Sequence, residues 1–565
     1  MGVNKRPFLA TIVMLAIVNI ILLLFVAGVA QLIDSTEYGN YALNIIHALQ
    51  WMVIPSSVLV PNNIGIKILS VLVFIIGLVL FSGTIIALTT THIRNYITRK
   101  STARGKLNMS GHYVVLNYNN KLPTLLREMS YNNIDDTVLI LSHKDKTDIK
   151  GLLRYNTLTT KPNSKVNIVV RQGNPHNLSE LEDVALQHSK AILIVHDNAN
   201  DVSDMNTVGL LLSIGSNINV DTHIVIEAHS NQLQDMIQKI SDIMPTLQDK
   251  DIISYCSNQK IGQFLALSII RPQLVRVVYD LLSFVRLSIY DSDYYKSIDN
   301  YLYEFTNSLP IICEHNKVFV LANNRASILE QRKTKLPSIL QLELVKASQT
   351  YNNCYIYGHN DKYQYMMQEL MRIDDRIICK NYDLDRLDDF VADIGNDSNA
   401  VAVILSTDNN DDNVLRALIT ISGKYGIKPS FGILVHISNP NNQINVEQFG
   451  IDAIIVSNKI VSFFAMQNLV KKNAHTFYQT LLSYGVGEFN LCIDRASLVV
   501  QFGNSNMYFD SYLQLVLSIY SSSMHKILPI GVAYQYDNLY FCNGLDIYRQ
   551  FELNCNDNLI YIRYS

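Results

Sequence analysis

The sequence lacks most of the features that mark an enzyme, a secreted protein or a nucleic-acid-binding protein. Its seven cysteines include no C-x-x-C pair, and no Cys/His cluster has the spacing of a metal site. It contains no H-E-x-x-H, no P-loop and no G-x-S-x-G motif. The net charge of −3 over 565 residues provides no basic excess for nucleic acid. We therefore predict neither catalysis nor nucleic-acid binding, and we expect reduced, cytoplasmic thiols.

Charged side chains are almost missing from two long apolar stretches near the N-terminus. Residues 7–33 contain none, and residues 66–91 contain only Lys67. Because a membrane-spanning helix needs about 20 mainly apolar residues, we predict that both stretches cross a lipid bilayer. Residues 28–30 resemble a signal-peptide cleavage site, but the apolar region before them is too long for a signal peptide.

Basic residues flank the two stretches on their outer sides. Lys5 and Arg6 precede the first stretch, whereas the connector between the stretches carries Asp34 and Glu37. The basic residues that follow the second stretch are Arg94, Arg99, Lys100, Arg104 and Lys106. The positive-inside rule then predicts that both termini of a two-span hairpin, residues 1–106, are cytoplasmic. Without an organelle-targeting signal, we expect a bacterial inner membrane.

The connector has the pattern of an ion-channel pore. Residues 41–53 have helical apolar spacing but are too short to span, and Pro55 and Pro61 prevent the helix from continuing. Non-helical backbone is tolerated at membrane depth where it is buried in protein or lines water. An extracellular loop with an interfacial helix explains the same residues equally well. The candidate pore and filter residues are Trp51, Ile54, Pro55, Ser56, Ser57 and Val58.

From residue 107 onward, short β-branched runs alternate with helical segments. This alternation predicts βαβ units on a parallel sheet, as in a doubly wound, Rossmann-like lobe. The pattern restarts at Asn353, and each lobe is followed by a helix pair and a strand-containing tail. We therefore predict an α-helical pore domain and then two tandem α/β copies, residues 107–348 and 349–565. Each copy is expected to have a Rossmann-like lobe and a small C-terminal α+β lobe.

Acidic and amide side chains follow one strand in each predicted lobe. Open α/β sheets place ligands at the carboxyl ends of their strands, and Ca²⁺ prefers oxygen ligands of these types. Helix capping and turn formation explain the same residues without a ligand. The first cluster is Asp197, Asn200, Asp201 and Asp204, and the second cluster is Asp408, Asp411 and Asp412.

Neither lobe has the glycines of a dinucleotide-binding turn. The first has Asn-Tyr-Asn-Asn-Lys at residues 117–121, and the second keeps only Gly358. Ser142 and His143 stand where an acidic residue would hold the ribose. Because side chains would block the approach of a pyrophosphate, we expect no NAD.

Residues 167–214 contain an arginine-x-glycine-x-proline turn (Arg171, Gly173, Pro175) and then the Asp/Asn-rich turn 197–204. With the order of the parts, these motifs resemble the potassium-conductance-regulator (RCK) channels and, more closely, the Castor/Pollux family of ion channels. The resemblance extends from about residue 48 to the end, strongest over the first cytoplasmic copy and weakest in the pore. Further matching residues are Glu227, Gly262, Pro272, Asp280 and Phe284.

The resemblance implies a homotetramer whose RCK units form a cytoplasmic gating ring around the exit of a cation pore. It also implies Ca²⁺ as a regulatory ligand, with Glu227 added to the candidate ligands. The permeant ion would be potassium or, in a non-selective pore, calcium as well. Gly77 and Gly83 could let the second span bend, although glycine in membrane helices also serves packing.

Two departures from the family keep other functions open. The signature T-V-G-Y-G is absent, and residues 54–61 contain no acidic residue where relatives carry aspartate. A non-conducting, membrane-anchored sensor or scaffold is therefore the alternative. An NAD(P)-linked membrane oxidoreductase is a third hypothesis, which only the Rossmann pattern supports.

Overall fold

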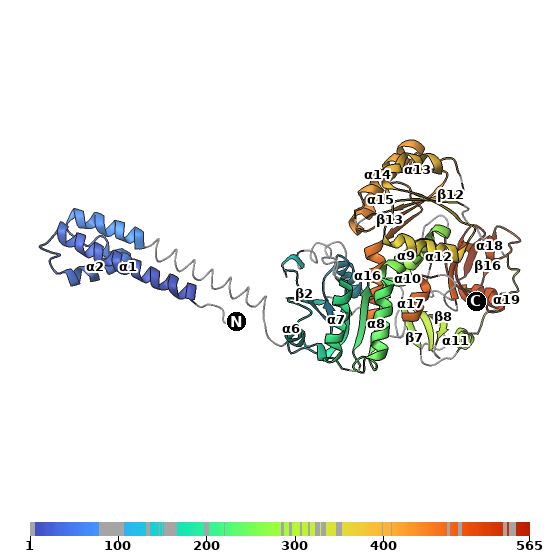
Figure 1. Cartoon of the computed structure of the whole chain (residues 1–565), viewed down its shortest axis with the longest axis horizontal. Helices are drawn as coiled ribbons and strands as arrows, with labels where there is room; N and C mark the ends of the chain where they lie inside the picture. The colour runs from blue at the N-terminus through green and yellow to red at the C-terminus, as the bar shows by residue number, and fades with distance from the viewer. Residues whose placement is uncertain are drawn as a thin grey trace. The chain divides into compact units, whose positions relative to one another are not determined.

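A computed structural model of the chain forms two compact units, Met1–Ala103 and Arg104–Ser565 (Figure 1). The backbone alone is described for residues 6–18, 203, 288, 314, 476, 540 and 541. In all, the structure describes residues 6–77, 107–131, 136–145, 147–149, 151, 166–196, 203–219, 221–283, 288–292, 297–304, 308–314, 317–322, 328, 335–345, 353–397, 399–407, 410–471, 475–483, 489–534, 540–541 and 550–564.

The first unit begins with the helices α1 (Arg6–Ile33) and α2 (Tyr41–Val53). The bounds of α2 are those predicted from the apolar spacing. Asn40 caps the start of the helix, since its Oδ1 accepts from Ala42 N at 3.1 Å. A 3₁₀ turn, η1 (Pro55–Ser57), follows, and residues 64–77 are again helical. Among the residues described, no helix meets the length and hydropathy that a membrane crossing requires.

A small apolar core holds the first unit together. Helix α1 packs on α2, and the Tyr41 hydroxyl donates to Leu24 O at 2.8 Å. Gly77 lies against Met52, because a Cβ atom at Gly77 would be only 2.5 Å from Met52 Cγ. The buried apolar side chains of this core are Val26, Ala30, Tyr38, Ala48, Trp51, Met52, Ile66 and Val73.

The second unit begins with a parallel six-stranded sheet in the order β3-β2-β1-β4-β5-β6. This is the strand order of the dinucleotide-binding doubly wound fold, and every residue of β1 and β5 is buried, as expected for parallel strands covered on both faces. The strands are β1 (His112–Leu116), β2 (Thr137–Ser142), β3 (Asn167–Gln172), β4 (Ser189–Ile194), β5 (His223–Ala228) and β6 (Asp251–Cys256). The connecting helices are α4 (Leu122–Tyr131), α6 (Leu178–Asp183), α7 (Ser203–Gly215) and α8 (Asn231–Ile243).

The second copy has a parallel five-stranded sheet in the order β11-β10-β12-β13-β14. It repeats the first sheet without a counterpart of β3, so β11 is its edge strand. The strands are β10 (Asn353–Tyr357), β11 (Ile378–Tyr382), β12 (Ala400–Leu405), β13 (Gly432–Ile437) and β14 (Ala453–Val456). The helices are α12 (Asp361–Ile373), α13 (Leu387–Ile394), α14 (Asp412–Tyr425) and α15 (Gln443–Glu447).

A helix pair follows each sheet, and the first helix of each pair packs on a helix of the other copy. These are α9 (Ser257–Ile270) with α10 (Leu274–Leu282), and α16 (Ser457–Val470) with α17 (His475–Leu481). Helix α9 of the first copy packs on α12 of the second, and α16 of the second packs on α4 of the first. One hydrophobic core therefore runs through both copies, and each copy also has a smaller core of its own.

Each copy ends in a small lobe that contains antiparallel strands. The first has the order β7-β9-β8, and the second has the sheets β15-β20-β17-β18 and β16-β19. Residues 338–345, between the copies, lie along the second lobe: Leu340 N donates to Ser518 Oγ at 2.9 Å, and Leu342 N donates to Ser522 Oγ at 3.0 Å. The elements are β7 (Ser288–Ser292), α11 (Ile298–Glu304), β8 (Ser308–Glu314), β9 (Lys317–Ala322), β15 (Phe489–Arg495), α18 (Ala496–Val499), β16 (Asn506–Phe509), α19 (Tyr512–Ser522), β17 (Ile527–Ala533), β18 (Tyr540–Phe541), β19 (Phe551–Asn554) and β20 (Asn558–Tyr564).

Strand β6 is the parallel strand that the sequence pattern did not predict. It ends at Cys256 and α9 begins at Ser257, so no Gly, Pro or Asn separates strand from helix. The duplication contained the missing signal, because β14 passes into α16 at Ser457 in the same way.

Candidate functional site

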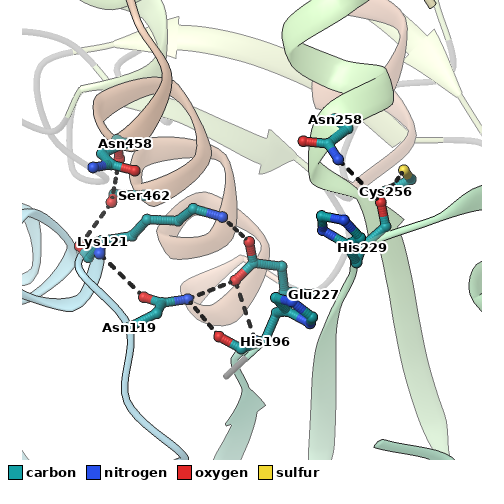
Figure 2. A network of polar contacts seen from close by, with 9 residues as sticks. All are labelled: Asn119, Lys121, His196, Glu227, His229, Cys256, Asn258, Asn458 and Ser462. Carbon is teal, nitrogen blue, oxygen red and sulfur yellow. Dashed lines mark hydrogen bonds and ion pairs between the residues drawn. The ribbon is translucent and has the colours of Figure 1, made fainter. Parts of the chain in front are cut away.

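Polar side chains converge at the carboxyl edge of the first sheet, where doubly wound folds bind ligands. Asn119 and Lys121 lie in the loop after β1, His196 follows β4, and Glu227 lies near the end of β5. We call these four residues the carboxyl-edge network. Figure 2 shows that their side chains or backbone groups meet at the carboxylate of Glu227.

Glu227 is the centre of the network and is 1% exposed. Its carboxylate forms an ion pair with the Lys121 ammonium group and accepts from Asn119 Nδ2 at 3.0 Å. The backbone N–H of His196 also donates to it, at 3.4 Å. Burial acts to raise the pKa of Glu227, but the Lys121 charge and the hydrogen bonds outweigh burial, so this pKa lies below its ordinary value. Glu227 is therefore a buried, compensated anion.

Asn119 orients the loop that carries Lys121. Its Oδ1 accepts from the backbone N–H of Lys121 at 3.1 Å, and its Nδ2 donates to His196 O at 3.1 Å. Asn117, two residues earlier, has a φ of 72°, a left-handed conformation that asparagine tolerates better than most residues. The loop thus joins β1 to β4 and β5 through side chains, at the place where a dinucleotide fold would present glycine backbone.

Lys121 of the network and the neighbouring His229 also contact the second copy. Ser462, on α16, donates its hydroxyl to Lys121 O at 2.8 Å. The His229 side chain lies 3.7 Å from the Asp361 carboxylate, measured from Nε2 to Oδ2, and Asp361 begins α12. A change at the carboxyl edge of the first sheet can therefore reach two helices of the second copy directly.

Two histidines stack beside the network. The rings of His196 and His229 lie 4.7 Å apart at an angle of 14°, and burial lowers the pKa of His196. The carbonyl of His229 accepts from Cys256 Sγ and from Asn258 Nδ2, both at 3.4 Å (Figure 2). These contacts connect the end of β5 to the junction between β6 and α9.

The first predicted acidic cluster lies only partly within the described residues. Asp197, Asn200 and Asp201 fall outside them, and the half-buried Asp204 accepts from Ser230 Oγ at 3.2 Å. Both oxygens of the Glu227 carboxylate already have partners, so Glu227 does not fit a Ca²⁺ site while Lys121 is in place. Within the described ranges, no three His, Cys, Asp or Glu side chains come close enough to hold a metal ion. The first Ca²⁺ site therefore remains a prediction that centres on residues 197–204.

The second cluster has a structural role where it is described. Asp411 is 3% exposed and accepts from Ser438 N at 2.9 Å, Asn439 N at 3.1 Å and Asn442 Nδ2 at 2.8 Å. Its carboxylate therefore ties the start of α14 to the loop after β13 and does not fit an open ligand position. Asp412 is exposed, and Asp408 lies outside the described residues.

The predicted pore residues separate into buried and exposed groups. Trp51 is 2% exposed, and its ring lies 5.8 Å from that of Tyr38. Val58 is also buried, and its carbonyl accepts from Ser70 Oγ at 2.6 Å. Ile54, Pro55 and Ser56 are exposed and Ser57 is half-buried. Of the predicted hinges, Gly77 makes the close contact with Met52 that packing requires, and Gly83 lies outside the described residues.

Comparison with known proteins finds two similar ion channels. No protein-family model matches the chain. A probable ion channel named POLLUX from Arabidopsis thaliana is 21% identical over 44% of this chain and 30% of its own length. A probable ion channel named CASTOR from Oryza sativa is 23% identical over 40% of this chain and 25% of its own length. The match thus spans less than a third of these relatives, which are named as channels and not as enzymes.

A solved structure shares the fold of most of this chain. The human SLO3 gating ring aligns with 80% of this chain and 99% of its own, at 14% identity and a TM-score of 0.51. A GsuK channel bound to NAD aligns with 99% of this chain and 98% of its own, at 11% identity and a TM-score of 0.41. The SLO3 likeness and the two parallel sheets confirm the predicted tandem, Rossmann-like fold. The sequence matches confirm the predicted resemblance of this chain to the Castor/Pollux ion channels.

Proposed function

We propose that this protein is a homotetrameric cation channel of the membrane, opened by its cytoplasmic tandem unit in response to a ligand. The observation that carries this proposal is the order of the parts. Two apolar segments with a short helix between them precede a unit that has the gating-ring fold. Two membrane helices per chain cannot enclose a pore, so conduction requires several copies. The exposed residues of η1 and the buried Trp51 behind them would form the filter region.

We infer that the carboxyl-edge network transmits the ligand signal. A ligand shifts a two-state equilibrium only if it interacts differently with the two states. Lys121 and Glu227 hold the loop after β1 against β5, while Ser462 and Asp361 connect the same edge to α16 and α12. A ligand that binds near residues 197–204 would move His196 and, with it, this set of contacts. The altered packing of α16 on α4 and of α12 on α9 would then act on the pore through the covalent connection.

Ca²⁺ is the ligand that we propose for this edge, since carboxylate and amide oxygens are its preferred donors. The predicted donors are in residues 197–204, next to His196. Because Glu227 is engaged with Lys121, we assign Glu227 a positioning role in the network and not a place in the Ca²⁺ coordination.

Cation efflux from proteoliposomes that contain the full-length protein tests this proposal. The efflux of potassium, sodium and calcium should be measured at Ca²⁺ concentrations from micromolar to millimolar. We expect efflux that Ca²⁺ increases, and we expect the variant Asp201→Ala/Asp204→Ala to lose the increase but keep basal conduction. The variant Asp235→Ala/Asp242→Ala removes two exposed carboxylates of α8 and is the matched control. Efflux without any effect of Ca²⁺ would exclude this ligand while retaining the channel.

A non-conducting sensor or scaffold is the second candidate. The observation in its favour is that residues 54–61 contain no acidic side chain and that Trp51 and Val58 are buried in the first unit. The absence of efflux above that of empty liposomes, for all three cations, would favour this candidate and reject the channel.

A further inference from the structure

Two cysteines of the second copy face each other on neighbouring parallel strands. Cys354 of β10 is the register partner of Cys379 of β11. Neighbouring strands lie about 4.7–4.9 Å apart, and disulfides join Cα atoms that are about 4.4–6.8 Å apart. The separation of the two backbones therefore permits a disulfide without a rearrangement of the sheet.

The two thiols differ in exposure and in chemistry. Cys354 is 1% exposed, whereas Cys379 is half-buried on the edge strand of the sheet. The hydrogen bond with Cys379 and burial raise the pKa of the Cys354 thiol, and the same hydrogen bond lowers the pKa of Cys379. The thiolate is the nucleophile in thiol–disulfide exchange. Cys379 is thus the accessible, attacking residue, and Cys354 is placed to resolve the product.

The first copy provides an internal reference. Its strands β1 and β2 place Tyr113 opposite Val138 at the register position that Cys354 and Cys379 occupy in the second copy. The sheet position therefore does not itself require sulfur. In the first sheet β2 is also covered at its outer side by β3, while in the second sheet β11 is the edge. Both the thiol pair and its access to solvent are specific to the second copy.

We propose that Cys354 and Cys379 form a reversible redox-modification site that a low-molecular-weight disulfide such as glutathione disulfide oxidises. The Cys379 thiolate attacks one sulfur of glutathione disulfide, whose S–S bond breaks, and one glutathione thiolate leaves and takes up a proton. The Cys354 thiol then loses its proton and attacks Cys379 sulfur, and the second glutathione leaves. Two protein thiols become one disulfide, while one glutathione disulfide becomes two glutathione thiols.

The two cysteines lie close to helix α12, which packs on α9 of the first copy. Cys354 belongs to the core that runs through both copies, and Cys379 packs against it. Tyr363 of α12 lies near both thiols, and α12 packs on α9 at Gly262. A bond between β10 and β11 would therefore act on the strands beneath α12.

Peptide mapping by mass spectrometry tests the proposal on the full-length protein in detergent. The protein is equilibrated in buffers of varied ratio of reduced to oxidised glutathione, quenched with acid and alkylated. We expect a linked peptide of Cys354 and Cys379, so that two of the seven cysteines lose their free thiols, and reversal by excess reduced glutathione. We also expect the oxidised protein to unfold at a higher temperature, because the bond constrains the unfolded chain.

Single variants distinguish the two roles. Cys354→Ser should accumulate a mixed disulfide of glutathione on Cys379, whereas Cys379→Ser should accumulate at least about tenfold less on Cys354. Cys313→Ser, which removes a half-buried cysteine on β8, should leave the linked peptide unchanged. Circular dichroism and size-exclusion profiles identify any variant that misfolds, and Cys354→Ala then replaces Cys354→Ser. The absence of the linked peptide at every ratio, or equal mixed disulfide in both single variants, would overturn the proposal. Neither result depends on ion conduction.

Discussion

At the carboxyl edges of the two sheets, the loop after the first strand makes the same contacts in both copies, whereas the residue near the end of β5 or β13 differs. In both copies an asparagine after the first strand accepts from the backbone N–H of a lysine, Asn119 from Lys121 at 3.1 Å and Asn360 from Lys362 at 3.0 Å. The same asparagines donate to the carbonyl group that follows the next central strand, His196 O or Ser406 O.

The two copies differ on the next strand of each sheet, which is β5 in the first copy and β13 in the second. Strand pairing places Glu227 of β5 and His436 of β13 at equivalent positions. Glu227 is an anion that Lys121 compensates, whereas burial lowers the pKa of His436 far below its ordinary value and the nearby Lys362 charge adds to this effect. His436 is thus a neutral residue, and its Nε2 is hydrogen-bonded to Ser457 Oγ. The loop geometry is common to the duplicated fold, and only the first copy places a buried ion pair on it.

The largest effect that this comparison predicts is on stability. Lys121→Met leaves Glu227 buried without its cation, and breaking a buried pair in this way costs about 3–5 kcal/mol. Lys362→Met leaves no buried carboxylate at the position equivalent to Glu227, because neutral His436 occupies it, so we expect a smaller loss than for Lys121→Met. Urea unfolding followed by circular dichroism measures both. Equal losses would show that the ion pair does not distinguish the copies.

A smaller difference is expected at the two helix crossings. A Cβ at Gly262 of α9 would lie 2.6 Å from Tyr365 Cβ and 2.8 Å from Lys362 O, so Gly262→Ala must push α9 away from α12, at a cost of about 1–3 kcal/mol. The equivalent residue of α16 is Ser462, and Ser462→Ala loses one hydrogen bond, worth about 1 kcal/mol. The same unfolding experiment compares them. A larger loss for Ser462→Ala would contradict the close packing of α9 on α12.

The smallest effect is a difference in pH dependence. Because the folded pKa of His436 lies below the unfolded value of about 6.5, the unfolded state binds the proton first and stability falls as the pH drops below that value. One group contributes at most about 1.4 kcal/mol per pH unit. We expect His436→Asn to reduce the slope of unfolding free energy between pH 7 and 5 in urea unfolding, and an unchanged slope would contradict a buried, neutral His436.

Glu227 should show the same direction of pH dependence over a lower pH range. Its folded pKa lies below its ordinary value, so its contribution is present above the unfolded pKa of about 4.3 and is lost as the pH falls further. Glu227→Gln should therefore change the slope only below that value. A change of the Glu227→Gln slope between pH 7 and 5 would contradict the assignment of a compensated anion.

The sequence predicted the sheets better than it predicted their contacts. The bounds of α2 follow from apolar spacing and from Pro55, and ten of the eleven parallel strands follow from short β-branched runs that alternate with helical segments. Strand β6 was missed because its β-branched run contains only Ile252 and Ile253, whereas β14, which also passes into its helix without a turn residue, has three β-branched residues in a row. Local pattern is sufficient for such elements because each is determined by its own side chains.

The partners of Glu227 could not be predicted in this way. Glu227 was a predicted site residue, but Lys121 lies 106 positions away in sequence, and only the strand order brings them together. The packing of α9 on α12 and of α16 on α4 likewise depends on the tertiary structure. The spacing of the duplicated copies in the sequence does not show which helices pack together. Glu227, predicted as a calcium ligand, is instead engaged by a lysine that the predicted site did not include.

The most direct test of the central claim compares Glu227→Gln and His436→Gln in the proteoliposome assay. If the first copy carries the ligand signal, Glu227→Gln should lose the increase of cation efflux on addition of Ca²⁺, while His436→Gln should retain it. Size-exclusion and circular-dichroism profiles must show that both variants are folded. An unchanged Ca²⁺ response in Glu227→Gln, or its equal loss in His436→Gln, would contradict the account.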